Sequence, residues 1–156
     1  MPKALITILG RSTWALVNSY YAILESGYYP DLVQVFAEDI YSDDVDKAVS
    51  GLKILSEEFG FSPEVKTEIV GEAEFIEAGL KLNSLIKELK QEGYTVAVDI
   101  TPGRKALVAG ALLPAEKLRV DHVFYLAVKD LGSKPYKMKP LKDQVLRDFI
   151  AEVRKR

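Results

Sequence analysis

The sequence contains no cysteine, which excludes disulfide bonds, thiol catalysis and metal sites built on thiolates. It contains a single histidine, His122, so neither a second histidine nor a cysteine is available to complete a zinc site. We therefore expect no bound metal and no cofactor. His122 is expected to be a strand residue whose ring is satisfied by hydrogen bonds.

Long apolar runs and strong positive charge are also missing. No apolar segment approaches the roughly 20 residues of a membrane-spanning helix, and the apolar stretch 4–9 is too short for the core of a signal peptide. The net charge is −2 and the pI is near 5.5, which argues against a surface that coats nucleic acid. We expect a cytoplasmic protein that contacts neither a membrane nor duplex nucleic acid directly.

What the sequence does contain is a regular alternation of strand and helix patterns. At 156 residues and 48% hydrophobic content, the chain can bury the core of one domain, 1–156. β-Branched and apolar runs predict strands at 4–9, 32–37, 64–70, 94–100 and 123–128. Apolar positions at helical spacing predict helices over 14–26, 45–59, 75–92 and 104–118. Near the C-terminus we expect a short edge strand at 135–141, then a helix with the apolar positions Leu141, Val145, Phe149 and Val153.

This alternation predicts an α/β fold, a Rossmann-like three-layer αβα sandwich around a mostly parallel sheet of five to six strands. In such sheets, ligands bind beyond the carboxyl ends of the strands, where the strand order switches direction. In the usual order, the first and fourth strands are neighbours at that point. The turns that follow them, Gly10–Thr13 and Thr101–Lys105, are therefore expected to face one crevice.

The first of these turns, Gly10-Arg11-Ser12-Thr13, leads into the first helix. Ser12 or Thr13 can be the N-cap of that helix, a structural role worth about 1 kcal/mol. Alternatively, a hydroxyl and the Arg11 guanidinium beside exposed helix amides suit a phosphate group. The residues alone leave both interpretations open.

The second turn begins at Asp99, passes through 101–103 and ends in the adjacent cations Arg104 and Lys105. Asp99 can cap the amides of the turn, which is a structural role. Positive charge is unfavourable at a helix N-terminus because of the helix dipole, so two cations there indicate a function. We predict that Lys105 contacts a phosphate.

An acidic cluster precedes the second helix. It consists of Asp39, Asp43, Asp44 and Asp46, and a metal-dependent nuclease uses such carboxylates, here together with Asp99. A loop followed by the first turn of a helix explains the same residues, because negative charge is favourable there. We prefer the second interpretation.

Aromatic residues gather early in the chain and are able to stack on bases. They are Trp14, Tyr20, Tyr21, Tyr28 and Tyr29. At helical spacing, Trp14 and Tyr21 are expected in the core instead. Tyr28 and Tyr29 follow the helix and are candidates for a dimer contact.

Two segments, Asp99-Ile-Thr-Pro-Gly-Arg-Lys105 and Gly10-Arg-Ser-Thr13, resemble the CRISPR-associated Rossmann-fold (CARF) domains. Those domains carry an Asp-x-Thr-Gly-Gly-Thr-Lys-like motif after the fourth strand and a hydroxyl-bearing turn after the first. In this chain, Thr101, Gly103 and Lys105 occupy the motif positions, and Ser12 matches the hydroxyl of the first turn.

Two residues depart from the motif. Pro102 stands where the family usually has glycine, which removes one backbone N–H that can hold a phosphate. Arg104 replaces a small hydroxyl residue, and it can supply the lost donor or block the ring. These departures bear on affinity and on ring size.

The resemblance implies a homodimer that binds cyclic oligoadenylate, most often cyclic tetra-adenylate, across its two-fold axis. The implied ligand-binding residues are Gly10, Arg11, Thr13, Asp99, Thr101, Pro102, Gly103 and Arg104. A CARF domain without a fused effector resembles the ring nucleases, which degrade this messenger without a metal and switch the response off.

The ring-nuclease resemblance implies catalytic roles for Ser12, which would position the ribose or phosphate, and Lys105, which would stabilise developing charge. The same residues serve an alternative function, that of a sensor which binds the ring without cutting it and regulates a partner protein.

Overall fold

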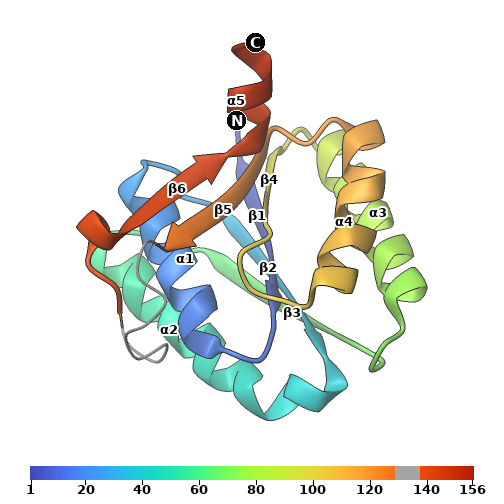
Figure 1. The fold of residues 1–156 in the computed structure, drawn as a ribbon, viewed down its shortest axis with the longest axis horizontal. Coiled ribbons are helices and arrows are strands. Elements are labelled where there is room, and N and C mark those ends of the chain that lie inside the picture. Colours follow the sequence, from blue (N-terminus) through green and yellow to red (C-terminus); the bar gives the residue numbers. More distant parts are fainter. Residues whose placement is uncertain (129–137) are drawn as a thin grey trace.

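The computed structural model describes residues 1–128 and 138–156, which form a six-stranded sheet with helices on both faces (Figure 1). The strands are β1 (Lys3–Leu9), β2 (Leu32–Glu38), β3 (Glu64–Val70), β4 (Thr95–Asp99), β5 (His122–Val128) and β6 (Gln144–Asp148). The helices are α1 (Thr13–Glu25), α2 (Val45–Glu58), α3 (Phe75–Gln91), α4 (Lys105–Leu118) and α5 (Phe149–Arg154), with short 3-10 helices η1 (Asp39–Asp44) and η2 (Leu141–Asp143). Within these ranges, none of the helices combines the length and apolar character that a bilayer crossing requires.

The strands lie in the order β3-β2-β1-β4-β5-β6. Strands β1 to β5 are parallel, and β6 pairs with β5 in the antiparallel direction. The order reverses between β1 and β4, where Thr7 lies opposite Asp99. The predicted α/β fold with a mostly parallel sheet is confirmed, and the carboxyl ends of β1 and β4 lie side by side at the switch point.

Strand β1 is buried on both of its faces, because its side chains alternate between two apolar clusters. Ile6 and Ile8 pack in the cluster that includes Leu107 of α4 and several residues of α3. Leu5 and Leu9 pack in the cluster on the other face, with α1 and α2. Figure 1 shows α3 and α4 together, away from α1 and α2. This two-sided burial explains why the strand reads as a continuous apolar run.

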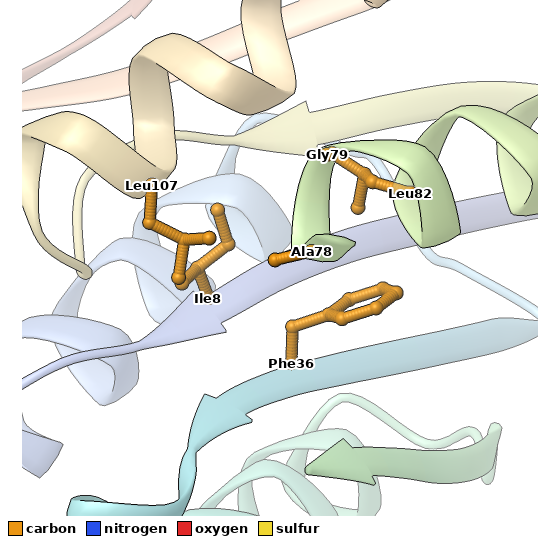
Figure 2. Close-up of a pocket in the computed structure, with 6 residues that line it drawn as sticks. All are labelled: Ile8, Phe36, Ala78, Gly79, Leu82 and Leu107. Atoms are coloured by element: carbon orange, nitrogen blue, oxygen red, sulfur yellow. The ribbon is translucent and has the colours of Figure 1, made fainter. Parts of the chain in front are cut away.

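The core beneath α3 and α4 is closely packed. A cavity of about 10 Å³ remains there, lined by Ile8, Phe36, Ala78, Gly79, Leu82 and Leu107 (Figure 2). Such a volume is about that of a single water probe, and its walls are apolar, so it has no room for a ligand. A ligand would therefore bind outside this core, beyond the ends of the strands.

Strand β3 is an outer strand of the sheet and carries charged side chains along its length. Glu64 and Lys66 are exposed, and Lys66 Nζ lies 3.4 Å from Glu64 Oε1. Glu68 Oε1 lies 3.0 Å from Nζ of Lys81, which belongs to α3. The β3 edge is thus polar, whereas the interior strand β1 is apolar.

The C-terminal segment differs from the prediction. The strand expected at 135–141 lies partly outside the described residues, and its described part is irregular at 138–140 before η2 begins. The edge strand is instead β6, in the segment where we expected a helix. Leu146 packs against the core, whereas Val145 and Arg147 face solvent. This alternation is typical of a strand, and the i, i+4 spacing of the apolar residues in this segment hides it.

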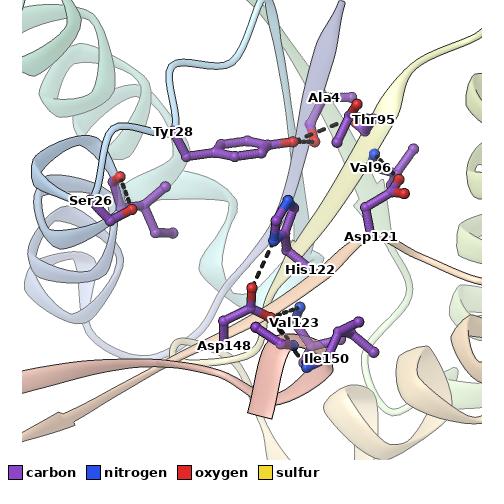
Figure 3. A network of polar contacts seen from close by, with 12 residues as sticks. Ala4, Ser26, Tyr28, Thr95, Val96, Asp121, His122, Val123, Asp148 and Ile150 are labelled. Carbon is purple, nitrogen blue, oxygen red and sulfur yellow. Dashed lines mark hydrogen bonds and ion pairs between the residues drawn. The ribbon is translucent and has the colours of Figure 1, made fainter. Parts of the chain in front are cut away.

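Asp148 explains where β6 ends and the last helix begins. Its Oδ1 accepts hydrogen bonds from the backbone N–H of Ile150 and Ala151, at 3.2 and 3.4 Å, so α5 starts only at residue 149. Its Oδ2 lies 2.7 Å from Nδ1 of His122 at the start of β5 (Figure 3). The His122 ring also stacks on Phe124, with 5.4 Å between ring centroids. The prediction that His122 is a strand residue with a satisfied ring is confirmed.

Candidate functional site

The turn after β1 places a serine at the start of a helix. Ser12 is the N-cap of α1, and its Oγ accepts a hydrogen bond from the backbone N–H of Ala15 at 3.2 Å. Its own O–H remains available as a donor, because no other described residue takes it. Arg11 is exposed, and Thr13 is the first helical residue. The structural role of Ser12 is therefore compatible with a contact to a phosphate oxygen.

The turn after β4 is held from below by side-chain contacts. The backbone N–H of Thr101 donates to Asp99 Oδ1 at 3.0 Å, and Thr101 Oγ1 accepts from the backbone N–H of Leu126 at 2.9 Å. Pro102 is buried. Asp99 and Pro102 therefore shape the turn from its buried side.

The two turns touch each other through their glycines. A Cβ on Gly10 would lie 2.6 Å from the backbone nitrogen of Gly103 and 2.8 Å from its Cα. Gly103 has a φ of +93°, and a Cβ there would lie 2.8 Å from Cγ2 of Ile8. Glycine is needed at both positions, at the first for space and at the second for space and conformation. The turns after β1 and β4 therefore meet at one edge of the sheet, as the sequence predicts.

Asp99 is buried, and its carboxylate accepts hydrogen bonds from the groups around it. Its Oδ2 lies 2.6 Å from Ser19 Oγ and 3.2 Å from Thr7 Oγ1. Ser19 Oγ also lies 3.0 Å from the carbonyl oxygen of Leu16, and a hydroxyl has only one hydrogen to donate. That hydrogen therefore serves either Asp99 Oδ2 or the Leu16 carbonyl oxygen at any one time. Burial raises the pKa of Asp99, against the opposing effect of its hydrogen bonds from Ser19, Thr101 and Thr7.

Arg104 is occupied by acidic partners. Its Nε lies 3.2 Å from Oε2 of Glu38, and its Nη2 lies 3.8 Å from Oε1 of Glu72. A hydrogen bond with Tyr41, and then the charge of Glu38, raise the pKa of Arg104. The Glu38 side chain is only 2% exposed, so Arg104 neutralises a buried carboxylate at the end of β2. The sequence analysis did not identify Glu38. An acidic residue at the end of an otherwise apolar strand could have indicated a buried carboxylate with a charged partner.

The other two cations of the turns, Arg11 and Lys105, are exposed and can contact a ligand. Lys105 is the first residue of α4 and is exposed. Neither Lys105 nor Arg11 forms an ion pair with any residue in the described ranges. Exposed cations beside two helix N-termini can hold an anion.

No protein-family model matches the sequence, and no curated protein sequence matches it. Solved structures do match. Can2 from Sulfobacillus thermosulfidooxidans, in complex with cyclic tetra-adenylate, superposes with a TM-score of 0.56 at 10% identity, over 79% of this chain and 31% of that one. A type III CRISPR defence DNA nuclease activated by cyclic oligoadenylate gives 0.59 at 18% identity, over 83% and 19%. Csm6 from Enterococcus italicus, bound to cyclic hexa-2′-fluoro-hexa-dAMP, gives 0.64 at 16% identity, over 86% and 35%.

The chain has the fold of a CARF domain. It spans at most about a third of each of these three proteins, so the similarity concerns one part of them. The CARF fold agrees with the resemblance that the two turns carry in the sequence. At 10–18% sequence identity, the similarity to these three proteins concerns the fold alone.

The carboxylates of this CARF fold do not gather into a metal site. Within the described residues, no group of three histidine, cysteine, aspartate or glutamate side chains could hold a metal ion. Asp39 and Asp43 lie in η1, whereas Asp99 is buried beneath the β4 turn. His122 lies at the opposite edge of the sheet, because β5 begins there. The other two members of the acidic cluster are Asp44, at the end of η1, and Asp46, in the first turn of α2.

Proposed function

We propose that this protein binds a cyclic oligoadenylate, specifically cyclic tetra-adenylate, at the edge where the β1 and β4 turns meet. The observation that carries the proposal is the backbone contact between Gly10 and Gly103, which joins the two turns into one surface. That surface presents the Ser12 hydroxyl and the exposed cations Arg11 and Lys105. Of the three structural relatives, one is in complex with cyclic tetra-adenylate, one is activated by cyclic oligoadenylate and one is bound to an analogue. This supports the same ligand class here.

We further propose that the ring is held by two copies of the chain. A cyclic tetra-adenylate repeats the same unit around a closed ring, so a two-fold pair of identical surfaces matches its symmetry. Each copy would then contribute one Ser12 and one Lys105. A monomer that binds the ring with full affinity would contradict this arrangement.

The proposed reaction is metal-independent cleavage of the ring. The 2′-hydroxyl of an adenosine attacks its own 3′-phosphate, the bond from phosphorus to the 5′-oxygen breaks, and a 2′,3′-cyclic phosphate and a 5′-hydroxyl form. The 2′-oxygen loses a proton and the 5′-oxygen gains one. The protein contributes in-line alignment, with Ser12 on the ribose or phosphate and Lys105 on the developing negative charge. Destroying the messenger would switch off type III CRISPR signalling.

A non-cleaving sensor is the second candidate, and a specific observation favours it. No described side chain at this surface is placed to act as a free general base, since Asp99 and Glu38 are buried and engaged. Alignment and charge stabilisation alone give slow cleavage or none. A protein that binds the ring intact would transmit the signal to a partner protein.

The deciding experiment is incubation of the purified protein with cyclic tetra-adenylate in EDTA, followed by chromatography. Linear di-adenylate with a terminal cyclic phosphate establishes the ring nuclease, whereas tight binding of an intact ring establishes the sensor. An unbound, intact ring contradicts both. Lys105→Ala should weaken binding and cleavage, while Lys87→Ala, an exposed lysine on α3, should change neither.

A further inference from the structure

A groove adjoins the first turn of the candidate site. It has a volume of about 750 Å³ and lies between α1 and α2. Arg11, Ser12 and Thr13 belong both to this groove and to the β1 turn. The volume is in the range of pockets that take a small molecule. The groove is therefore a binding surface continuous with the proposed phosphate contacts.

The walls of the groove are apolar and include an exposed indole. Trp14, Val17, Ile54 and Leu55 contribute to the lining. Trp14 is 38% exposed and Ile54 is 60% exposed, so both present uncovered apolar surface. An exposed indole in an apolar groove suits a planar aromatic group, because stacked rings bury large faces.

Polar groups at the α2 end of the groove restrict which aromatic group fits. Asp44 and Asp46 supply carboxylate oxygens, which only accept hydrogen bonds, and Lys47 supplies a cation. The exocyclic amine of adenine is a donor, and a carboxylate at this place can accept a hydrogen bond from it.

We propose that the groove between α1 and α2 binds an adenine base, stacked on Trp14, while the attached phosphate meets Ser12 and Arg11. This inference rests on the proposed function, because it takes the base from the same cyclic oligoadenylate. It places the base against Trp14 and the carboxylates at the start of α2, outside the two turns.

Trp14 also provides the test, because it is the only tryptophan in the chain. We would titrate the intact protein with cyclic tetra-adenylate and follow tryptophan emission, with calorimetry on the same samples. The emission should change with the same midpoint as the heat of binding. Adenosine monophosphate should also change the emission, whereas ribose 5-phosphate, which lacks a base, should not.

Variants separate stacking from a general change in the surface. Trp14→Ala should weaken ring binding by about 5- to 150-fold in calorimetry, and Trp14→Phe should recover part of the loss. Tyr125→Ala, which removes an exposed aromatic ring on β5 outside the groove, should leave the affinity unchanged. Circular dichroism confirms that each variant is folded.

The outcomes for the groove and for the proposed function are distinct. A ring that binds by calorimetry with no change in emission, and with full affinity for Trp14→Ala, overturns the groove and leaves the function standing. An emission change with adenosine monophosphate but no binding of the ring supports the groove and contradicts the proposed function. Equal responses to adenosine monophosphate and to ribose 5-phosphate overturn the proposed contact with the base.

Discussion

Substitution of Gly10 by alanine tests whether the two turns must touch. The added methyl group would lie 2.6 Å and 2.8 Å from backbone atoms of Gly103, which have no rotamer by which to move aside. The β1 and β4 turns would have to separate, and overpacking of this kind costs about 1–3 kcal/mol. In a chain of this size, each kcal/mol lowers the melting temperature by about 2–4 °C.

Gly71→Ala is the matched control for this experiment. Its new Cβ would also come within 3 Å of a neighbour, at 2.9 Å, but that neighbour is Cγ of the flexible side chain of Glu74. Differential scanning calorimetry should therefore show a clear loss for Gly10→Ala and little change for Gly71→Ala. Ring affinity should fall with Gly10→Ala as well, because the surface is split. Equal melting temperatures for Gly10→Ala and the wild type would refute the reasoning.

Three further predictions concern the supports of the site. Burial raises the pKa of Asp99, so its contribution to the free energy of unfolding is fully present below about pH 4 and is lost as the pH rises through the raised pKa. Asp99→Asn should therefore gain in melting temperature over the wild type as the pH rises above about 4, and a difference that stays constant with pH would contradict this. Arg104→Ala leaves the buried carboxylate of Glu38 without its cation and should cost about 1–3 kcal/mol in urea unfolding, less when combined with Glu38→Gln; equal costs in both backgrounds would show that the pair is not coupled. Asp148→Ala removes the N-cap of α5 together with the hydrogen bond to His122, so it should cost more than about 1 kcal/mol, which is the cost of losing a cap alone. Asp143→Ala in η2 should be neutral, and identical unfolding curves for the two variants would exclude this role of Asp148.

Much of the fold could be predicted because its signals are local and repeated. The strand at 64–70 and the helix at 105–118 have bounds within a residue of the prediction, since apolar patterns and glycines mark them. The meeting of the two turns also followed, because the strand order of a doubly wound sheet brings the carboxyl ends of β1 and β4 together. The C-terminal helix was wrong where β6 pairs with β5, because the pairing partner is not visible in a local pattern.

The exposure and the contacts of single side chains were harder to predict from the sequence. Trp14 was expected in the core, but it is exposed, while Tyr20 in the same helix is 1% exposed and bonded to Ser56 at 2.8 Å. Helical periodicity gives a face, and the position of α2 decides which residues of that face are covered. Similarly, no local sequence pattern shows that Arg104 pairs with Glu38. Arg104 lies in the turn before α4, whereas Glu38 belongs to β2, far away in the sequence.

The charged side chains of β3 have a consequence for how copies of this protein can associate. A second chain that added a strand there would bring Glu64 and Lys66 beside its own backbone, away from the water that solvates them. Edge strands with such charges resist continuation of the sheet into a neighbour. At this edge the protein is thus guarded against open-ended, fibre-like growth. The two-fold pairing proposed above would therefore use other surfaces, and a two-fold contact closes after one partner has bound.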